Sequence, residues 1–272
     1  MHEIPLLFST CSCIPIPSAE GIVAQTELIC FYLQMGLKTR LGRLILPRLP
    51  VSRHVFDHVR MELNAFHARV ALRIYPSRFI KRSQLKRQKN LLVNIGCGPF
   101  GLPGWINFDL YALKSVTLPV DCRLSIPLGA KSCRGIHVEH YLEHLEPGKE
   151  LPAFLAECRR CLAPEGVLRI IVPDAAKFVK AYQSPGWDEL NTLIYDDECS
   201  EHTFRSKMDA LNHVFLQNGE HYGGFDEERL QEVLKQSGFS RVQRREWRQG
   251  EFPGGCIDRE LHRNNSLYFE AR

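Results

Sequence analysis

The last two-thirds of the chain alternate short apolar segments with helical ones, and this alternation restricts the fold more than any other feature. Apolar runs bounded by turn residues predict seven strands, at residues 91–95, 106–108, 117–120, 135–138, 167–172, 240–247 and 266–271. Helical periodicity falls between these runs, at 151–162, at 175–182 and after Asp226. Strands that alternate with helices are typical of a parallel sheet. We therefore expect an α/β fold with a doubly wound, mostly parallel seven-stranded sheet, whose last two strands form an antiparallel edge.

The region before this alternation differs in composition. Residues 36–90 hold 14 basic and two acidic residues, a net charge of +12, whereas residues 91–272 hold 21 basic and 26 acidic residues, a net charge of −5. Apolar residues at helical spacing over 55–74 and a polar stretch over 77–90 predict a basic helical arm followed by a linker. Residues 1–35 are predicted to be a loose N-terminal extension. Such a charge asymmetry fits an anionic partner, either nucleic acid or a lipid surface, and fits a solvated helical face equally well.

The ten cysteines give no disulfide framework and no metal site. Only Cys158 and Cys161 are closely spaced, inside a predicted helix, and no second pair stands at zinc spacing, so we expect both to pack in the core. Scattered, unpaired cysteines fit a reducing compartment, which favours a cytoplasmic location. No run reaches the roughly 20 apolar residues that a membrane span needs.

The strongest local motif is an apolar strand that runs directly into Gly96-Cys97-Gly98. Paired glycines at this place let the backbone approach a nucleotide closely. The spacing also matches the dinucleotide fingerprint, which requires a helix to begin at the glycines and to receive a pyrophosphate. Pro99 and Pro103 oppose such a helix here. Because no helix end is expected, a ligand without phosphate groups is favoured over NAD.

Polar residues at the ends of the first three strands are candidates for contacts with that ligand. Asp109 ends the second strand, 13 positions after Gly96 and short of the roughly 20 that a dinucleotide site has. Its carboxylate is expected to accept hydrogen bonds from both hydroxyl groups of a ribose. Asp121 ends the third strand, where it would accept from an adenine amino group while the N–H of Cys122 donates to the ring. Asn94, at the end of the first strand, completes this set.

These motifs together resemble those of a class I S-adenosylmethionine-dependent methyltransferase. The resemblance rests on residues 94–98, 104–109, 139–145 and 167–174, and on a C-terminal pattern that includes His221-Tyr222 and residues 266–271. More narrowly, they resemble a bacterial family of predicted methyltransferases linked with cell-surface polysaccharide synthesis.

The resemblance implies a Rossmann-like methyltransferase fold over 91–272 and S-adenosyl-L-methionine as the cofactor. Gly96 to Gly98 would lie under the methionine part of the cofactor, Asp109 at the ribose and Asp121 at the adenine. Asn94 stands where the superfamily usually has an acidic residue, which leaves the contact with the cofactor's amino group open.

A histidine-rich stretch follows the fourth strand, running from His137 to His144. If it is helical, His140 and His144 share one face, as metal ligands can, but no third ligand is apparent and no metal is expected. Glu139 stands where such enzymes often contact cofactor or substrate and is a candidate catalytic residue. His144 is a candidate general base, or a histidine that only packs beneath the cofactor.

Residues 184–224 interrupt the alternation and are predicted to form a cap over the acceptor site. Within them we expect Asn212 to contact the substrate, and His221 to act as a general base or to orient an acceptor hydroxyl. The alternative is that both hold the insertion together through hydrogen bonds to loop backbone.

The sequence thus predicts a methyltransferase that acts on a small-molecule or saccharide acceptor. Two alternatives remain open at this stage: a nucleic-acid methyltransferase that uses the basic arm, and an inactive scaffold protein that binds the cofactor.

Overall fold

The computed structural model describes residues 52–194 and 204–272, so the predicted extension at 1–35, the first part of the basic arm and residues 195–203 of the predicted cap lie outside the described residues. Seven strands form one sheet in the order β3-β2-β1-β4-β5-β7-β6. The strands are β1 (Leu91–Ile95), β2 (Ile106–Asp109), β3 (Leu118–Pro119), β4 (Cys133–Glu139), β5 (Leu162–Pro173), β6 (Val242–Arg245) and β7 (Ser266–Ala271). The pairs among the first five strands are parallel, and β7 is antiparallel to both neighbours. The predicted fold class is confirmed.

Some of the helices after β4 begin at an aspartate whose side chain caps them. The described helices after β4 are η2 (Leu142–His144), α4 (Glu150–Cys161), α5 (Ala175–Gln183), α6 (Asp188–Leu193), α7 (Lys207–Leu216), η4 (Gln217–Gly219), α8 (Glu227–Gln236) and η5 (Glu260–His262). Asp174 caps α5 by accepting from the N–H of Ala176 at 3.1 Å, and Asp226 caps α8 by accepting from the N–H of Arg229 at 2.8 Å. Gly238 ends α8 with a φ of +87°, which a glycine adopts without strain.

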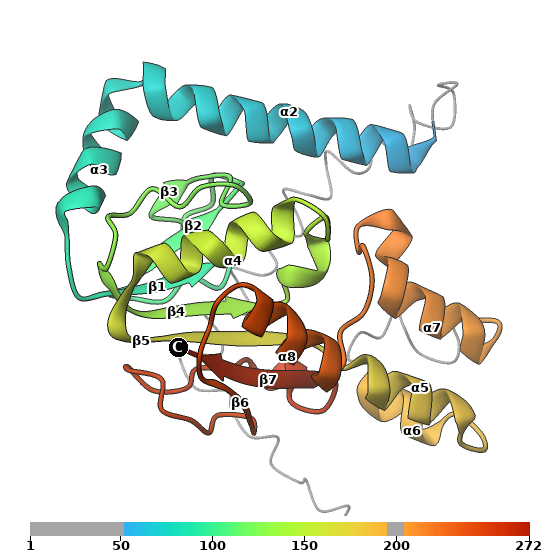
Figure 1. The fold of residues 1–272 in the computed structure, drawn as a ribbon. Coiled ribbons are helices and arrows are strands. Elements are labelled where there is room, and N and C mark those ends of the chain that lie inside the picture. Colours follow the sequence, from blue (N-terminus) through green and yellow to red (C-terminus); the bar gives the residue numbers. More distant parts are fainter. Residues whose placement is uncertain (1–51, 195–203) are drawn as a thin grey trace, which may run out of the picture. The chain divides into compact units, whose positions relative to one another are not determined.

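Different segments of the chain cover the two faces of the sheet. Even-numbered and odd-numbered residues of a strand point to opposite faces. Figure 1 shows α4 and α8 lying across one face. Even-numbered residues of β5, such as Ile170, and of β4, such as Val138, join the apolar side chains of these helices in the main core. Odd-numbered residues of the same strands face the segment 246–263 instead, with Gly135 against Phe252 and Arg169 bound to Asp258. This second face therefore holds a buried polar layer.

The connections β1–β2, β2–β3 and β3–β4 contain no helix. The absence after β1 confirms the expectation drawn from the prolines behind the glycine motif. Parallel strands usually need a crossover helix, and here ten residues, Gly96 to Trp105, bridge β1 and β2 as a loop. No helix N-terminus is therefore available beside the glycines to receive a pyrophosphate.

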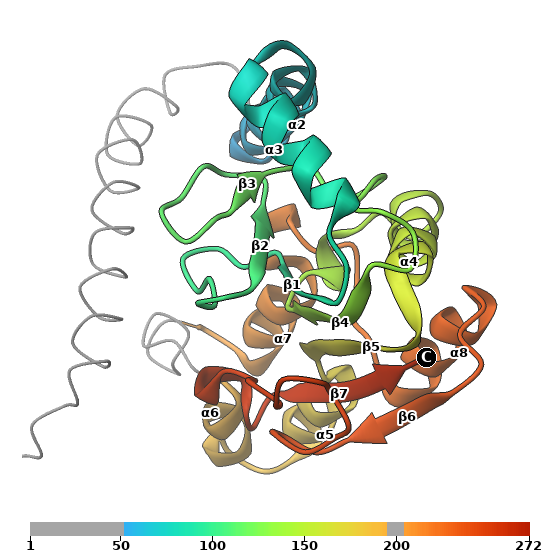
Figure 2. The ribbon, with the colours of Figure 1, turned by 90° about the vertical axis from the view of Figure 1, so that its left-hand side faces the viewer.

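Within the part of the chain that the structure describes, two helices precede the sheet, and they correct the predicted linker. The helix α2 (Arg53–Ile74) covers the predicted helical stretch and is capped by Ser52, and Pro76 occupies the first turn of a second helix, α3 (Pro76–Arg87), where the linker was predicted. Proline is favoured at that position because the missing N–H would have no partner there. Both helices belong to the same compact unit as the sheet, residues 51–272, and lie beside β3 (Figures 1 and 2). The predicted division between an arm with a linker and a main domain at residue 91 is thus not seen.

The apolar stripe predicted on α2 is exposed. Leu63 and Phe66 are 63% and 65% exposed, whereas small residues on another face, such as Ala65 and Ala68, are buried. No described helix is both long enough and apolar enough to cross a membrane.

Leu85 tests whether α3 belongs to the core. This side chain is 3% exposed and lies in the main core cluster. We expect Leu85→Ala to lower the free energy of unfolding by about 2–3 kcal/mol, through lost burial and the cavity left behind. Leu63→Ala is the matched control and should change it by less than about 0.5 kcal/mol. Chemical denaturation of both variants checks this, and equal small effects would mean that α3 contributes nothing to the core.

Candidate functional site

A pocket of about 330 Å³ lies at the carboxyl ends of β1, β4 and β5. The chain order reverses between β1 and β4, which is where open α/β sheets bind their ligands. Its floor is Gly96-Cys97-Gly98, and Glu139 and Pro173 end the two strands beside it. The predicted cap contributes a part of the remaining wall, with Leu193, Ile194, Phe204, Ala210, His213, Val214, Gln217 and His221.

The glycine loop has a backbone that only glycine adopts readily. Gly96 has a φ of +70°, and a Cβ there would lie 2.7 Å from the ring of Tyr141. Gly98 has a φ of +51°, and a Cβ there would meet nothing within 4 Å. The first glycine therefore allows close packing beneath the loop, and the second keeps the space above the loop open.

Asp109 holds this loop in place. Its carboxylate accepts from the N–H of Gly98 at 2.8 Å and from the N–H of Tyr111 at 3.0 Å. Burial raises the pKa of Asp109 despite these hydrogen bonds. The residue predicted to bind the ribose is thus next to the pocket floor, although it does not line the pocket itself.

Two other predicted cofactor residues flank the loop. The side chain of Asn94 is buried under it, donating to the carbonyl oxygen of Phe100 at 3.3 Å and lying 3.4 Å from the Nδ1 of His137. Cys97 lines the pocket, and burial raises the pKa of its thiol to about 12. The thiol is therefore neutral and is a contact surface rather than a nucleophile.

Asp121 and Cys122 are placed differently from the expectation. The carboxylate of Asp121 is buried and forms ion pairs with Arg69 of α2 and with Arg123. These two guanidinium groups hold the pKa of Asp121 below its usual value against the effect of burial. Cys122 is buried in the core. Neither lines the pocket, so the oxygens assigned to an adenine amino group are instead occupied by arginine.

Glu139 lines the pocket but has its own partners. Its carboxylate accepts from the Nδ1 of His262 at 2.8 Å and from the backbone N–H of Arg259 at 3.1 Å, and the Nε of Arg259 lies 3.0 Å away. Burial alone would raise the pKa of Glu139, but the hydrogen bond from His262 and the charge of Arg259 lower this pKa to about 2. A carboxylate with this pKa is a weak base, and its contacts suit it to orienting Arg259 at the pocket.

The histidine-rich stretch is not an α-helix, which corrects the idea that His140 and His144 share one face. His140 has a φ of +52°, stacks on His262 with ring centroids 3.5 Å apart, and lies 2.8 Å from the hydroxyl of Ser266. Burial holds the pKa of His140 well below its usual value, so it is neutral.

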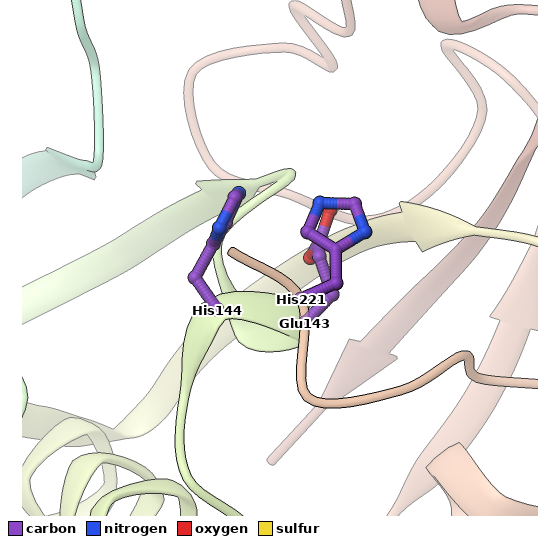
Figure 3. Close-up of side chains that lie close together, drawn as sticks. All are labelled: Glu143, His144 and His221. Atoms are coloured by element: carbon purple, nitrogen blue, oxygen red, sulfur yellow. The ribbon is translucent and has the colours of Figure 1, made fainter. Parts of the chain in front are cut away.

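Instead, the structure brings His144 together with His221 and with Glu143 (Figure 3). The rings of the two histidines are 4.6 Å apart at 78°. A backbone hydrogen bond of 2.8 Å from Tyr222 to the carbonyl of Glu143 holds the loop of His221 beside the short helix η2. Burial lowers the pKa of both histidines, to about 4 for His221, so both imidazoles are neutral.

Asn212 is not brought to the pocket. It lies on an exposed part of α7, whereas His213 and Val214 of the same helix line the pocket. The cap itself packs on α5 through a second apolar cluster made of Phe178, Ala181, Leu190, Leu193, Ala210 and Leu211. The described part of the insertion therefore lines the pocket, but His213 and Val214 face it in place of the predicted Asn212.

Three pocket residues had no role in the sequence-based prediction: Glu143, Arg259 and His262. Glu143 stands in the histidine-rich stretch, where its neighbour His144 was a usable signal. Arg259 and His262 lie more than 100 positions from Glu139 in a loop without regular spacing, so no local pattern marks them.

No protein-family model and no curated protein matches the chain. Among solved structures, it is similar to a SAM dependent methyltransferase from Archaeoglobus fulgidus, at 15% identity and a TM-score of 0.38, over 72% of this chain and 91% of that one. A SAM-dependent methyltransferase from Thermotoga maritima, described as a possible histamine N-methyltransferase, has 17% identity and a TM-score of 0.40 over 80% and 96%.

A third similar structure is 1,6-didemethyltoxoflavin-N1-methyltransferase from Burkholderia thailandensis, with bound 1,6-didemethyltoxoflavin and S-adenosylhomocysteine. It has 15% identity and a TM-score of 0.38, over 82% of this chain and 92% of that one. TM-scores of this size describe a distant similarity, so the function has to be inferred from the residues and geometry of the chain itself.

Proposed function

We propose that the protein is an S-adenosylmethionine-dependent methyltransferase that acts on a small-molecule or saccharide acceptor. The observation that carries the proposal is the pocket at the point where the strand order reverses, whose floor is an open glycine loop with no helix behind it. Such a floor suits a nucleoside without phosphate groups. The order of the sequence motifs, which resemble those of class I methyltransferases, supports the same cofactor.

The methyl group of this cofactor is already activated by the sulfonium, so the protein's task is to align the acceptor with it and to exclude water. The cap supports this role because its side chains form one wall of the pocket. Next to the floor, the neutral rings of His144 and His221 form the part of the lining that an acceptor would meet. The ionised Glu139 keeps the guanidinium of Arg259 in the lining of the pocket, where it would orient a polar or negatively charged acceptor group.

The size of the pocket, about 330 Å³, supports a small acceptor or a single sugar unit. Apolar side chains from the cap and from the floor loop, such as Phe204 and Phe100, line it together with the polar residues already named. Pockets with mostly apolar walls and a few fixed polar groups are typical of small-molecule sites. The narrower link with surface polysaccharides depends on the sequence resemblance alone.

Calorimetry with three ligands tests the proposal. We expect S-adenosylmethionine and S-adenosylhomocysteine to bind to the full chain at one site, and NAD to bind at least about 100-fold more weakly. Comparable affinity for NAD would overturn the proposal. Binding of the cofactor with no S-adenosylhomocysteine formed on hydroxylated small molecules or sugars would favour the inactive scaffold instead.

A further inference from the structure

Three side chains that line the pocket converge as metal ligands would. A carboxylate oxygen of Glu143 and a ring nitrogen each of His144 and His221 all lie within 4.8 Å of one another. They come from two separate segments, the short helix η2 after β4 and the loop before α8. Figure 3 shows the ring of His221 with one nitrogen directed toward Glu143 and the other directed away.

Glu143 gives a second, independent indication. This residue is 2% exposed, and neither carboxylate oxygen has a hydrogen-bond partner among the described residues. The Nδ1 of His140 lies 3.6 Å from one of these oxygens, and His140 is a neutral imidazole. A buried carboxylate without a partner is costly, and coordination of a cation is one of the few arrangements that offset this cost.

Both histidines are oriented as metal-binding histidines usually are. The Nδ1 of His144 lies 3.1 Å from the carbonyl oxygen of Glu220, and the Nδ1 of His221 lies 2.8 Å from that of Val214. A carbonyl oxygen only accepts, so each Nδ1 carries the proton and each Nε2 keeps its lone pair. This hydrogen bond from the second nitrogen to a carbonyl fixes the tautomer and the ring orientation that a metal requires.

We propose that Glu143, His144 and His221 bind a divalent first-row transition metal ion such as Zn²⁺. Two imidazoles with one carboxylate suit such ions, whereas Ca²⁺ and Mg²⁺ prefer sites made of oxygen alone. Three protein ligands leave at least one coordination position open toward the pocket, as in catalytic zinc sites.

A role for this ion rests on the proposed methyltransferase function. An acceptor hydroxyl bound at the open position loses its proton to water more easily, because the cation lowers its pKa. The resulting oxygen forms the bond to the methyl carbon while the bond between carbon and sulfur breaks. The electron pair of that bond stays on sulfur, giving the neutral thioether S-adenosylhomocysteine.

Zinc binding to the chelator-treated full-length protein tests the site. We expect calorimetry with ZnCl₂ to show one equivalent bound to the wild type in this site. We expect zinc binding to be weakened by about 100-fold or more in each of Glu143→Gln, His144→Gln and His221→Gln. This exceeds the roughly 10–100-fold loss that follows removal of a residue that only forms a hydrogen bond to a metal ligand. The matched control is His213→Gln, because His213 lines the same pocket outside the cluster. Co²⁺ should give visible absorption bands in the wild type and in this control, and lose them in the three variants.

The outcomes separate the metal site from the methyltransferase. Retention of the Zn²⁺ and Co²⁺ signals in folded Glu143→Gln and His221→Gln, or an equal loss in His213→Gln, would overturn the site. S-adenosylhomocysteine binding, measured on the chelator-treated wild type, should persist. If it persists and zinc does not bind, the metal proposal alone is wrong. If zinc binds and the cofactor does not, the metal site stands and the proposed function fails.

Discussion

Replacing Arg169 by methionine is expected to lower the free energy of unfolding by about 3–5 kcal/mol, with a fall of roughly 10 °C in the melting temperature. Arg169 is 0% exposed in the polar layer behind the sheet. Its Nε donates to Asp258 at 2.6 Å, its Nη1 donates to Glu270 at 3.2 Å and to the carbonyl of Gln249 at 3.0 Å, and its Nη2 donates to the carbonyl of Glu246 at 3.3 Å. Methionine fills similar volume but leaves the buried carboxylate of Asp258 without this cation, whereas Glu270 keeps the Nε of Arg245 at 2.9 Å.

The pH dependence of the stability that Arg169→Met loses identifies the cause of this loss. Arg169 holds the pKa of Asp258 well below its usual value, so in the wild type this carboxylate stabilises the fold above its unfolded pKa and loses that effect only as the pH falls through the lower folded pKa. Without the arginine, burial raises the pKa of the carboxyl, which can then become neutral on mild acidification. The deficit of Arg169→Met should therefore shrink from pH 7 to pH 5.

Arg241→Met is the matched control for this prediction. Arg241 is half exposed and lies 3.1 Å from Glu251. An ion pair of this kind contributes at most about 1 kcal/mol, so the control should unfold nearly as the wild type does. If thermal and urea unfolding gave both variants the same small loss, the buried ion pairs would not stabilise the second face of the sheet.

The sheet was predictable because its strands are short apolar runs bounded by turn residues. Five of the strands form parallel pairs. Consecutive side chains along such a strand are buried, as in the sequence from Val167 to Val172. Arg169 sits in the middle of that run. The local pattern gives no sign of its partner Asp258, which is 89 positions away and meets it only after the fold has formed.

The helices before the sheet show what local patterns cannot decide. The spacing of Leu63 and Phe66 predicts a helix correctly but not which face of that helix is buried, and these side chains are exposed. The polar composition around Leu85 predicts a linker, yet burial of this one side chain places α3 in the core. In both cases tertiary packing, which has no short-range signature, decides the outcome.

The site was partly predictable for a similar reason. Gly96 to Gly98 and Glu139 follow strands directly, and the ends of neighbouring parallel strands meet at one edge of the sheet, so their place at the pocket could be inferred. The position of a residue at the pocket does not by itself determine its protonation state. The basicity of Glu139 depends on His262 and Arg259, which approach from a distant loop.

The second large effect is expected at Gly98. The space where its side chain would project is empty, and in the proposed function this space belongs to the methionine part of the cofactor. The N–H of Gly98 is fixed by Asp109 at 2.8 Å, so the loop cannot easily move aside. We expect Gly98→Val to weaken S-adenosylhomocysteine binding by about 100-fold or more, equivalent to about 2.8 kcal/mol, through a direct clash with the ligand.

Gly104 provides the control that separates this clash from backbone strain. It lies in the same connection between β1 and β2, has a φ of +78°, and a Cβ there would also meet nothing within 4 Å, but it does not line the pocket. Valine at either position must adopt an unfavourable backbone conformation, so the two variants should lose comparable thermal stability. Only Gly98→Val should lose ligand affinity in calorimetry, because only its side chain enters the pocket. A variant at Gly98 that binds S-adenosylhomocysteine as tightly as Gly104→Val does would show that the cofactor lies elsewhere.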